Sequence, residues 1–157
     1  MQSRDKPFLP PRWFIRGAWA VHRALYSLSG GRFGLRKPTS RTYGTLRLKT
    51  TGRRSGAERI AILGYFEDGP NVFTLAMNGW GDPEPAWWLN LQARPEVTIE
   101  LPDGTRAVRA RAATGDERER LWRELEQRQP ELDRYASLRS RETAVVVFEP
   151  RTESAHG

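Results

Sequence analysis

The chain contains no cysteine in its 157 residues. This excludes disulfide frameworks, thiolate nucleophiles, zinc ribbons and iron–sulfur clusters. Histidine is almost as scarce, since only His22 and His156 are present, and two residues at the two ends of the chain do not make a histidine-rich metal site. The middle of the chain therefore has no Ser-His-Asp triad, and acid–base chemistry falls to carboxylates, tyrosines or a bound cofactor.

Long uninterrupted hydrophobic runs are also missing. The most apolar stretch, residues 8–28, is interrupted by Arg12, Arg16 and Arg23, so it fits neither a membrane-spanning helix nor a signal peptide. We therefore expect a cytoplasmic protein. At helical spacing the stretch is predicted to form a basic, aromatic, amphipathic helix. Such a helix more often packs on its own domain with its arginines facing solvent. The alternative is that it attaches peripherally to the anionic inner face of the cell membrane.

The cationic charge lies mainly in one part of the chain. The formal net charge is +7, but residues 1–59 contain 14 Lys or Arg and 2 acids, whereas residues 60–157 contain 12 and 17. This asymmetry indicates that the N-terminal third meets an anionic partner, which could be nucleic acid, an anionic lipid surface or a polyanionic small molecule. The charge alone does not choose among them.

Alternating apolar and polar residues predict a β-rich domain. Over residues 43–51, Leu46 and Leu48 share one face and Arg47 and Lys49 the other, which is typical of a strand. Similar patterns predict strands over residues 60–66, 72–76, 97–101, 105–112 and 144–148, and helices over residues 87–92, 116–128 and 131–138. Since closure removes exposed strand edges, we expect an α+β fold with a small barrel of about six antiparallel strands and flanking helices. The predicted division is residues 1–40 for the N-terminal helix and linker, 41–150 for the barrel and 151–157 for a tail.

The segment TTGRRSG, residues 50–56, lies between the first two predicted strands. Its glycines allow backbone N–H groups to form an anion-binding nest, and its arginines and hydroxyls add further donors, so that a phosphate would fit. The alternative is a solvated hairpin loop, in which the arginines only face water. The residues of the turn favour neither interpretation over the other.

A second segment, residues 76–91, combines a glycine- and proline-rich loop with Trp80, Trp87 and Trp88. Three indoles beside such a loop could form the wall of a planar ligand site. Alternatively one or more of them fills the core, which is the better interpretation for Trp87 or Trp88 taken singly. An anion-binding turn and an aromatic wall without a catalytic triad fit a protein whose cofactor carries the reaction.

The segments TTGRRSG, YFEDG, NGW, PAWWLNLQARPEV and VVVFEP follow one another between residues 41 and 150. Their order and spacing resemble the deazaflavin (F420)-dependent nitroreductase and quinone reductase family. The resemblance implies a flavin-type split β-barrel, like that of flavin reductases and pyridoxamine-phosphate oxidases. It also implies that coenzyme F420 binds and that hydride passes to a quinone, nitroaromatic or similar electrophile. FMN is the alternative cofactor, because the same phosphate site suits both.

A basic nucleic-acid-binding module is the remaining alternative, but no recognised nucleic-acid motif accompanies the charge. We therefore expect a small-molecule electron acceptor and no nucleic acid as partner. The oligomeric state stays open.

The resemblance also implies roles for individual residues. The phosphate would be bound at the TTGRRSG turn, the deazaflavin ring would lie beside the second strand and the loop after the third, Trp87 would pack on the cofactor and Asn90 would fix the turn. Tyr65 and Tyr135 are the candidates for proton donation or substrate contact. Asp82 and Glu84 stand where relatives often carry a cation. The expected cofactor-binding residues are Thr51, Gly52, Arg53, Arg54, Ser55, Ile60, Ala61, Ile62, Leu63, Met77, Asn78, Gly79, Trp87 and Asn90.

Overall fold

The computed structural model describes residues 35–77 and 80–151. The expected N-terminal helix, the tail from residue 152, and Asn78 and Gly79 lie outside the described residues. The predicted division at residues 40 and 150 therefore stays a prediction. Within the described ranges, no helix has the length and apolar character needed to cross a membrane.

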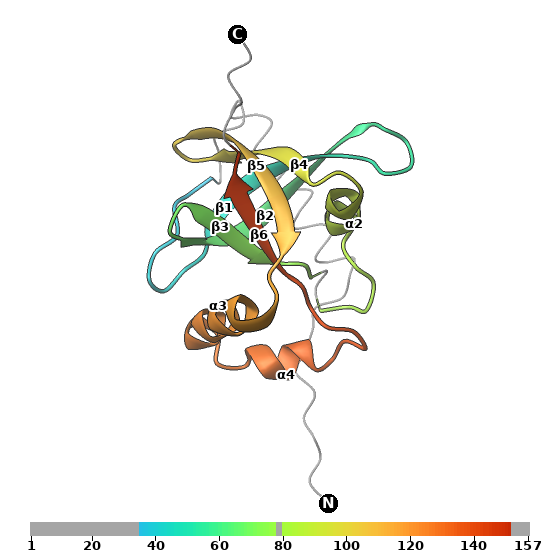
Figure 1. Ribbon diagram of the computed structural model, residues 1–157. Helices are drawn as coiled ribbons and strands as arrows, with labels where there is room; N and C mark the ends of the chain where they lie inside the picture. The colour runs from blue at the N-terminus through green and yellow to red at the C-terminus, as the bar shows by residue number, and fades with distance from the viewer. Residues whose placement is uncertain (1–34, 78–79, 152–157) are drawn as a thin grey trace, which may run out of the picture.

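Six antiparallel strands form a closed barrel in the order β1-β2-β3-β6-β5-β4 (Figure 1). This confirms the α+β barrel expected from the sequence. The strands are β1 (Gly44–Thr51), β2 (Glu58–Asp68), β3 (Asn71–Leu75), β4 (Glu96–Leu101), β5 (Gly104–Ala112) and β6 (Val145–Pro150).

Burial along the strands follows their residue patterns. In β1, Leu46 and Leu48 are fully buried inside the barrel, as their alternation with charged residues predicts. In β6 the whole run Val145–Phe148 is buried, because Val146 and Phe148 face the barrel interior while Val145 and Val147 face a second core outside it. A strand covered on both faces has a continuous apolar sequence, and this is the run seen here.

The helices lie in two places on the barrel (Figure 1). Helix α2 (Ala86–Ala93) contacts β1 and β2 at one side, whereas α3 (Gly115–Arg128) and α4 (Leu132–Ala136) lie together at one end and cover the second core. Helix α4 is shorter than the predicted 131–138. Its continuation forms tighter turns, in which the N–H groups of Leu138 and Arg139 donate to carbonyls three residues back, and Arg139 then turns into the protein.

Strand β2 is longer than predicted, since Glu58 and Arg59 pair with the end of β1 although both are exposed and polar. It pairs with β1 over residues 58–65 but with β3 only over residues 66–68. Next to that pairing, the Thr74 hydroxyl donates to the carbonyl of Gly64 at 2.6 Å, and β3 pairs with β6 on its other edge. In the described part of the chain, residues 58–63 thus have a strand on one edge only. The six strands still close the barrel, but the pairing between β2 and β3 is interrupted there, and this gap in the pairing is called the split below.

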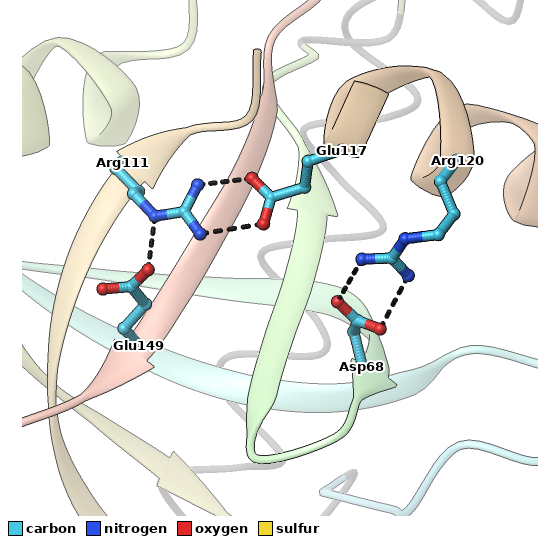
Figure 2. A network of polar contacts seen from close by, with 5 residues as sticks. All are labelled: Asp68, Arg111, Glu117, Arg120 and Glu149. Carbon is cyan, nitrogen blue, oxygen red and sulfur yellow. Dashed lines mark hydrogen bonds and ion pairs between the residues drawn. The ribbon is translucent and has the colours of Figure 1, made fainter. Parts of the chain in front are cut away.

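Ion pairs attach α3 to the barrel (Figure 2). Arg111 of β5 donates to the carboxylates of Glu117 on α3 and Glu149 on β6, and Arg120 of α3 makes a two-point contact with Asp68 of β2 at 2.9 and 3.0 Å. Hydrogen bonds from these arginines lower the pKa values of Asp68 and Glu117. The network holds α3 against β2, β5 and β6.

Candidate functional site

The turn between β1 and β2 is closed by its own backbone. Gly52 N donates to Ala57 O at 2.7 Å and Gly56 N donates to Gly52 O at 2.8 Å. Gly56 has a φ of 71°, which side chains disfavour, and a Cβ on Gly52 would come within 2.8 Å of Ser55 Oγ. Gly56 therefore suits this tight conformation through its positive φ, and a side chain at residue 52 would require Ser55 to move.

Asn90 of α2 fixes the turn, as the resemblance implies. Its buried side chain accepts hydrogen bonds from Arg53 N at 3.1 Å and Arg53 Nη1 at 3.3 Å, and its Nδ2 donates to Thr50 Oγ1 at 3.1 Å. One buried amide thus joins the end of β1, the turn and α2. That these residues bind a cofactor remains a prediction.

The turn offers side-chain donors, and four of its backbone N–H groups already donate within the protein. A nest that uses all the N–H groups of the turn is therefore not formed, and anion binding at the turn stays a prediction. Arg53, Arg54 and Ser55 are exposed, and within the ranges that the structure describes, the Arg54 side chain has no hydrogen-bond or ion-pair partner. An anion here would meet two guanidinium groups on a rigid support. The backbone N–H groups already used are those of Gly52, Arg53, Gly56 and Ala57.

The four β2 residues expected beside the ring do not share one face. Ala61 and Leu63 pair with Leu48 and Leu46 of β1 and therefore point to the barrel side, whereas Ile60 and Ile62 point the other way. Ile60 is 39% exposed and Ile62 6%. A planar ring cannot contact all four side chains, but the edge of β2 that no described strand covers, called the open edge below, presents the backbone of all four. The structure therefore favours the strand edge as the contact surface.

The loop after β3 begins at the same split. Met77 is 40% exposed at its start, and the expected ring-binding residues Asn78 and Gly79 lie outside the described residues. Trp80 and Trp88 are only 7% and 6% exposed and belong to the two cores. The hypothesis of three tryptophans around a ligand is thus wrong for two of them, because their indoles are already packed in the protein.

Trp87 remains for a ligand wall, since it is half-buried and packs against the barrel core. It precedes Asn90 on α2 by one helical turn, and Asn90 holds the arginine turn. The fold thus brings together Trp87, Asn90 and the turn residues that the resemblance implies.

The two candidate tyrosines lie in different cores. Tyr65 is 2% exposed inside the barrel, and burial, with a smaller effect of Glu67, raises its pKa to about 12. Tyr135 of α4 is half-buried and stacks on Trp80, with ring centroids 6.0 Å apart and planes at 16°. The burial of Tyr65 favours a packing role, whereas Tyr135 lies beside the loop that follows Met77.

One further residue at this loop, Arg139, was not among the residues expected from the sequence. Its side chain is fully buried and donates to the Glu84 carboxylate and to backbone carbonyls of the loop. Asp82 accepts a 2.6 Å hydrogen bond from Ser140 N, which lowers its pKa. Asp82 and Glu84, in the loop between β3 and α2, indicate that a cation lies nearby. Nothing in the sequence, however, selects Arg139 among the 26 Lys and Arg residues.

No group of three or more acidic or histidine side chains in the described ranges is arranged to hold a metal ion. The polar features gathered around the split are instead a pair of exposed arginines, the open edge of β2 and a loop anchored by a buried arginine. These features suit a large organic anion with a flat apolar part.

Sequence comparison identifies the same family that the sequence motifs resemble. The family described as "F420H(2)-dependent quinone reductase" matches residues 19–150. A Mycobacterium tuberculosis protein named F420H(2)-dependent quinone reductase is 33% identical over 135 residues, covering 83% of this chain and 89% of that protein. A second protein of that organism, which carries the same name provisionally, is 34% identical over 118 residues, covering 75% and 96%.

Solved structures agree. An F420-H2 dependent reductase superposes with a TM-score of 0.59 at 27% identity, covering 67% of this chain and 93% of that one. The heme storage protein HutZ of Vibrio cholerae has a TM-score of 0.50 at 15% identity, covering 69% and 82%, which shows a shared fold alone.

Proposed function

The chain belongs to the F420H(2)-dependent quinone reductase family, and on that premise we propose that it is an oxidoreductase that transfers a hydride from reduced coenzyme F420 to a quinone. The observation that carries the proposal is the Arg53–Arg54 turn, held by Asn90 directly beside the open edge of β2. It supplies an anion site and a flat backbone edge next to each other.

The turn residues fit the phosphate group of such a cofactor. Exposed guanidinium groups can donate two parallel hydrogen bonds to a phosphate, and the Asn90 contacts reduce the conformational freedom that Arg53 would otherwise lose on binding. Thr51 and Gly52 frame the turn, and the exposed Ser55 accepts a hydrogen bond from Ala57 N at 3.2 Å through its hydroxyl oxygen, which leaves the hydroxyl hydrogen to donate to a phosphate. F420 and FMN share a phosphate, so this part of the site accepts either.

The residues for the ring are those around the split. When bound, the cofactor supplies the hydride chemistry, and the protein supplies alignment and a dry surface. We propose that the edge of β2 over residues 60–63 orients one side of the ring. Met77 would cover the ring from the loop, with Asn78 and Gly79 beside it, and Trp87 would exclude water next to the turn.

For the electron acceptor, we propose Tyr135 as the residue that contacts the substrate or donates a proton. Its ring is held by Trp80, and it is only half-buried. Tyr65 is the weaker candidate, because its hydroxyl belongs to a buried ring with a raised pKa. Quinones are the expected substrates, and nitroaromatics are a further class of acceptor to test.

The proposal is tested by titrating the purified protein in parallel with F420, FMN and a single-stranded oligonucleotide, each followed by fluorescence. We expect saturable binding of F420 alone, followed by quinone-dependent oxidation of reduced F420. Preference for FMN would replace the cofactor, and oligonucleotide binding that falls steeply with salt would replace the function. An absence of F420 binding would end the proposal.

We further propose that the protein works in the cytoplasm and that residues 8–28 attach it peripherally to anionic membrane, near lipid-soluble quinones. The support is the sequence alone, which places tryptophans beside arginines on an amphipathic pattern. Co-sedimentation with anionic but not zwitterionic vesicles is the expected result, and no binding at low salt would contradict it.

A further inference from the structure

We propose that Arg139 is a positioning residue, which holds the two ends of the loop between β3 and α2 so that Met77 meets the cofactor ring. This inference rests on the proposed function. The Arg139 side chain would affect the reaction only by holding the loop in place.

The Arg139 side chain joins both ends of that loop. At the start of the loop, its Nη1 donates to the carbonyl of Ala76 at 3.3 Å. In the second half of the loop, Nε donates to Gly81 O at 3.0 Å, and Nη2 donates to Asp82 O at 3.2 Å and to the Glu84 carboxylate. The loop ends therefore cannot separate without breaking hydrogen bonds to one guanidinium.

Arg139 is itself held in place. Its Nη1 also donates to Thr143 Oγ1 at 2.9 Å, and the side chain is fully buried while that of Glu84 is 14% exposed. A buried guanidinium is costly unless its donors are paired. Here Nε, Nη1 and Nη2 all have acceptors, and the site is shaped for the planar fork of arginine.

The backbone of the loop needs such an anchor. Trp80 has a φ of 62°, a left-handed conformation that a bulky residue rarely adopts. The carbonyl of Gly81, the next residue, is one of the Arg139 acceptors, and the Trp80 ring is stacked on Tyr135. Strained backbone persists where its surroundings over-determine it, and it is common at ligand sites.

The same contacts join the two halves of the proposed site. Tyr135 lies four residues before Arg139, on the segment proposed to meet the acceptor, and Met77 follows Ala76, on the segment proposed to meet the ring. Arg139 would thus fix the segment proposed to contact the ring relative to the segment proposed to contact the acceptor, and the rate of hydride transfer would depend strongly on that alignment.

The test compares Arg139→Lys with Arg118→Lys. Arg118 donates to the carbonyl of Thr143 at 2.8 Å and pairs with Glu142, so it secures the same C-terminal segment. Neither of these contacts reaches the loop, which makes it a matched control for a purely structural effect. Lysine keeps the charge at both positions but cannot supply the fork.

For Arg139→Lys we expect kcat with reduced F420 and a quinone to fall about tenfold or more, since misplacement by about 1 Å can cost about a hundredfold. The F420 affinity should stay within about threefold, because the Arg53–Arg54 turn is intact. Amide hydrogen exchange at Met77, Gly81 and Asp82, measured without cofactor, should accelerate. Arg118→Lys should leave all three quantities nearly unchanged.

Glu84→Gln removes the charge but leaves the backbone acceptors, and we expect a smaller fall in kcat in the same direction. It keeps the test decisive if Arg139→Lys does not fold. Unchanged kcat in the folded variants, or an equal fall in Arg118→Lys, would overturn the proposal. If wild type failed to bind F420 while the loop amides still responded to Arg139→Lys, the proposed function would fail and the loop anchor would stand for another ligand.

Discussion

Arginines at the two sides of the barrel have different surroundings. At the β1–β2 turn, Arg53 and Arg54 are exposed, and the contacts of Arg53 are to a neutral amide. At the α3 end, Arg111 and Arg120 bind carboxylates of their own chain (Figure 2). The same side chain is left available for an external anion in one region and used to join elements in the other.

The difference lies in where the acids stand. Residues 60–157 contain 17 acids, whereas residues 1–59 contain 2, and the partners of Arg111 and Arg120 come from the acid-rich part. A surface ion pair contributes little by itself, but it does neutralise a cation that would otherwise attract anions. Binding should therefore depend on the turn, and stability on the α3 end.

The largest effect should come from Arg53→Ala combined with Arg54→Ala. Two charge-assisted contacts to phosphate are each worth roughly 1.5–3 kcal/mol, so F420 affinity should fall by about a hundredfold or more. The free energy of unfolding should change by less than about 0.5 kcal/mol, since both side chains are exposed. Fluorescence titration and urea unfolding measure the two. Arg123→Ala on α3, also exposed, is the control, and a loss below threefold would contradict the prediction.

Asn90→Ala should affect both binding and stability. It leaves the buried Thr50 hydroxyl and the Arg53 N–H without their partner, which costs about 2 kcal/mol of unfolding free energy. A turn that is no longer held should also bind F420 about tenfold more weakly. The same two measurements apply. A loss of stability with full affinity would show that the turn needs no support from α2.

Arg111→Met should reduce stability alone. The change removes the cation that Glu117 and Glu149 share, and the cost should be about 1 kcal/mol because all three side chains are partly exposed. Urea unfolding measures it, with Arg123→Met as the exposed control. Weaker F420 binding by a folded Arg111→Met protein would break the contrast between the two regions.

Acidic pH should slightly reduce the stability that the ion pairs around α3 give to the folded protein. Arg120 lowers the pKa of Asp68 below 3.8 and Arg111 lowers that of Glu117 below 4.5, so the folded state holds these protons less tightly than the unfolded state does. This stabilisation is complete above about pH 4.5 and is lost as pH falls through the lower folded-state pKa values. We expect the slope of Tm against pH below 4.5 to be shallower in Asp68→Asn. An identical slope would exclude a contribution from Asp68.

Much of the barrel was predictable because the residue patterns that indicate its strands lie within a few neighbouring residues. The alternation around Leu46 and Leu48 predicted the inner face of β1, and the apolar run at residues 145–148 predicted a buried strand. Glu58 and Arg59 were missed as strand residues because their strand state depends on pairing with β1, and polar side chains carry no sign of it.

The candidate site was predictable only in part. The turn sequence and the family resemblance identified Arg53, Arg54 and Asn90 as belonging together, and Asn90 does hold the turn. The packing of Trp80 was not predictable, since an indole beside a ligand and an indole in a core have the same sequence. The role of Arg139 depends on acceptors 55 to 63 residues away.

By itself, the sequence determined the strand pattern, the location of the cationic charge and the identity of the turn, because alternation, composition and glycine spacing act over a few neighbouring residues. Only the tertiary structure decided which arginines are neutralised. Barrel closure and the packing of α3 and α4 bring carboxylates from distant positions to Arg111 and Arg139 and bring none to Arg54 among the described residues. Whether a cation binds a ligand or its own protein is set by those long-range neighbours, because a hydrogen bond needs its partner within about 3 Å and salt screens Coulomb energies beyond about 10 Å.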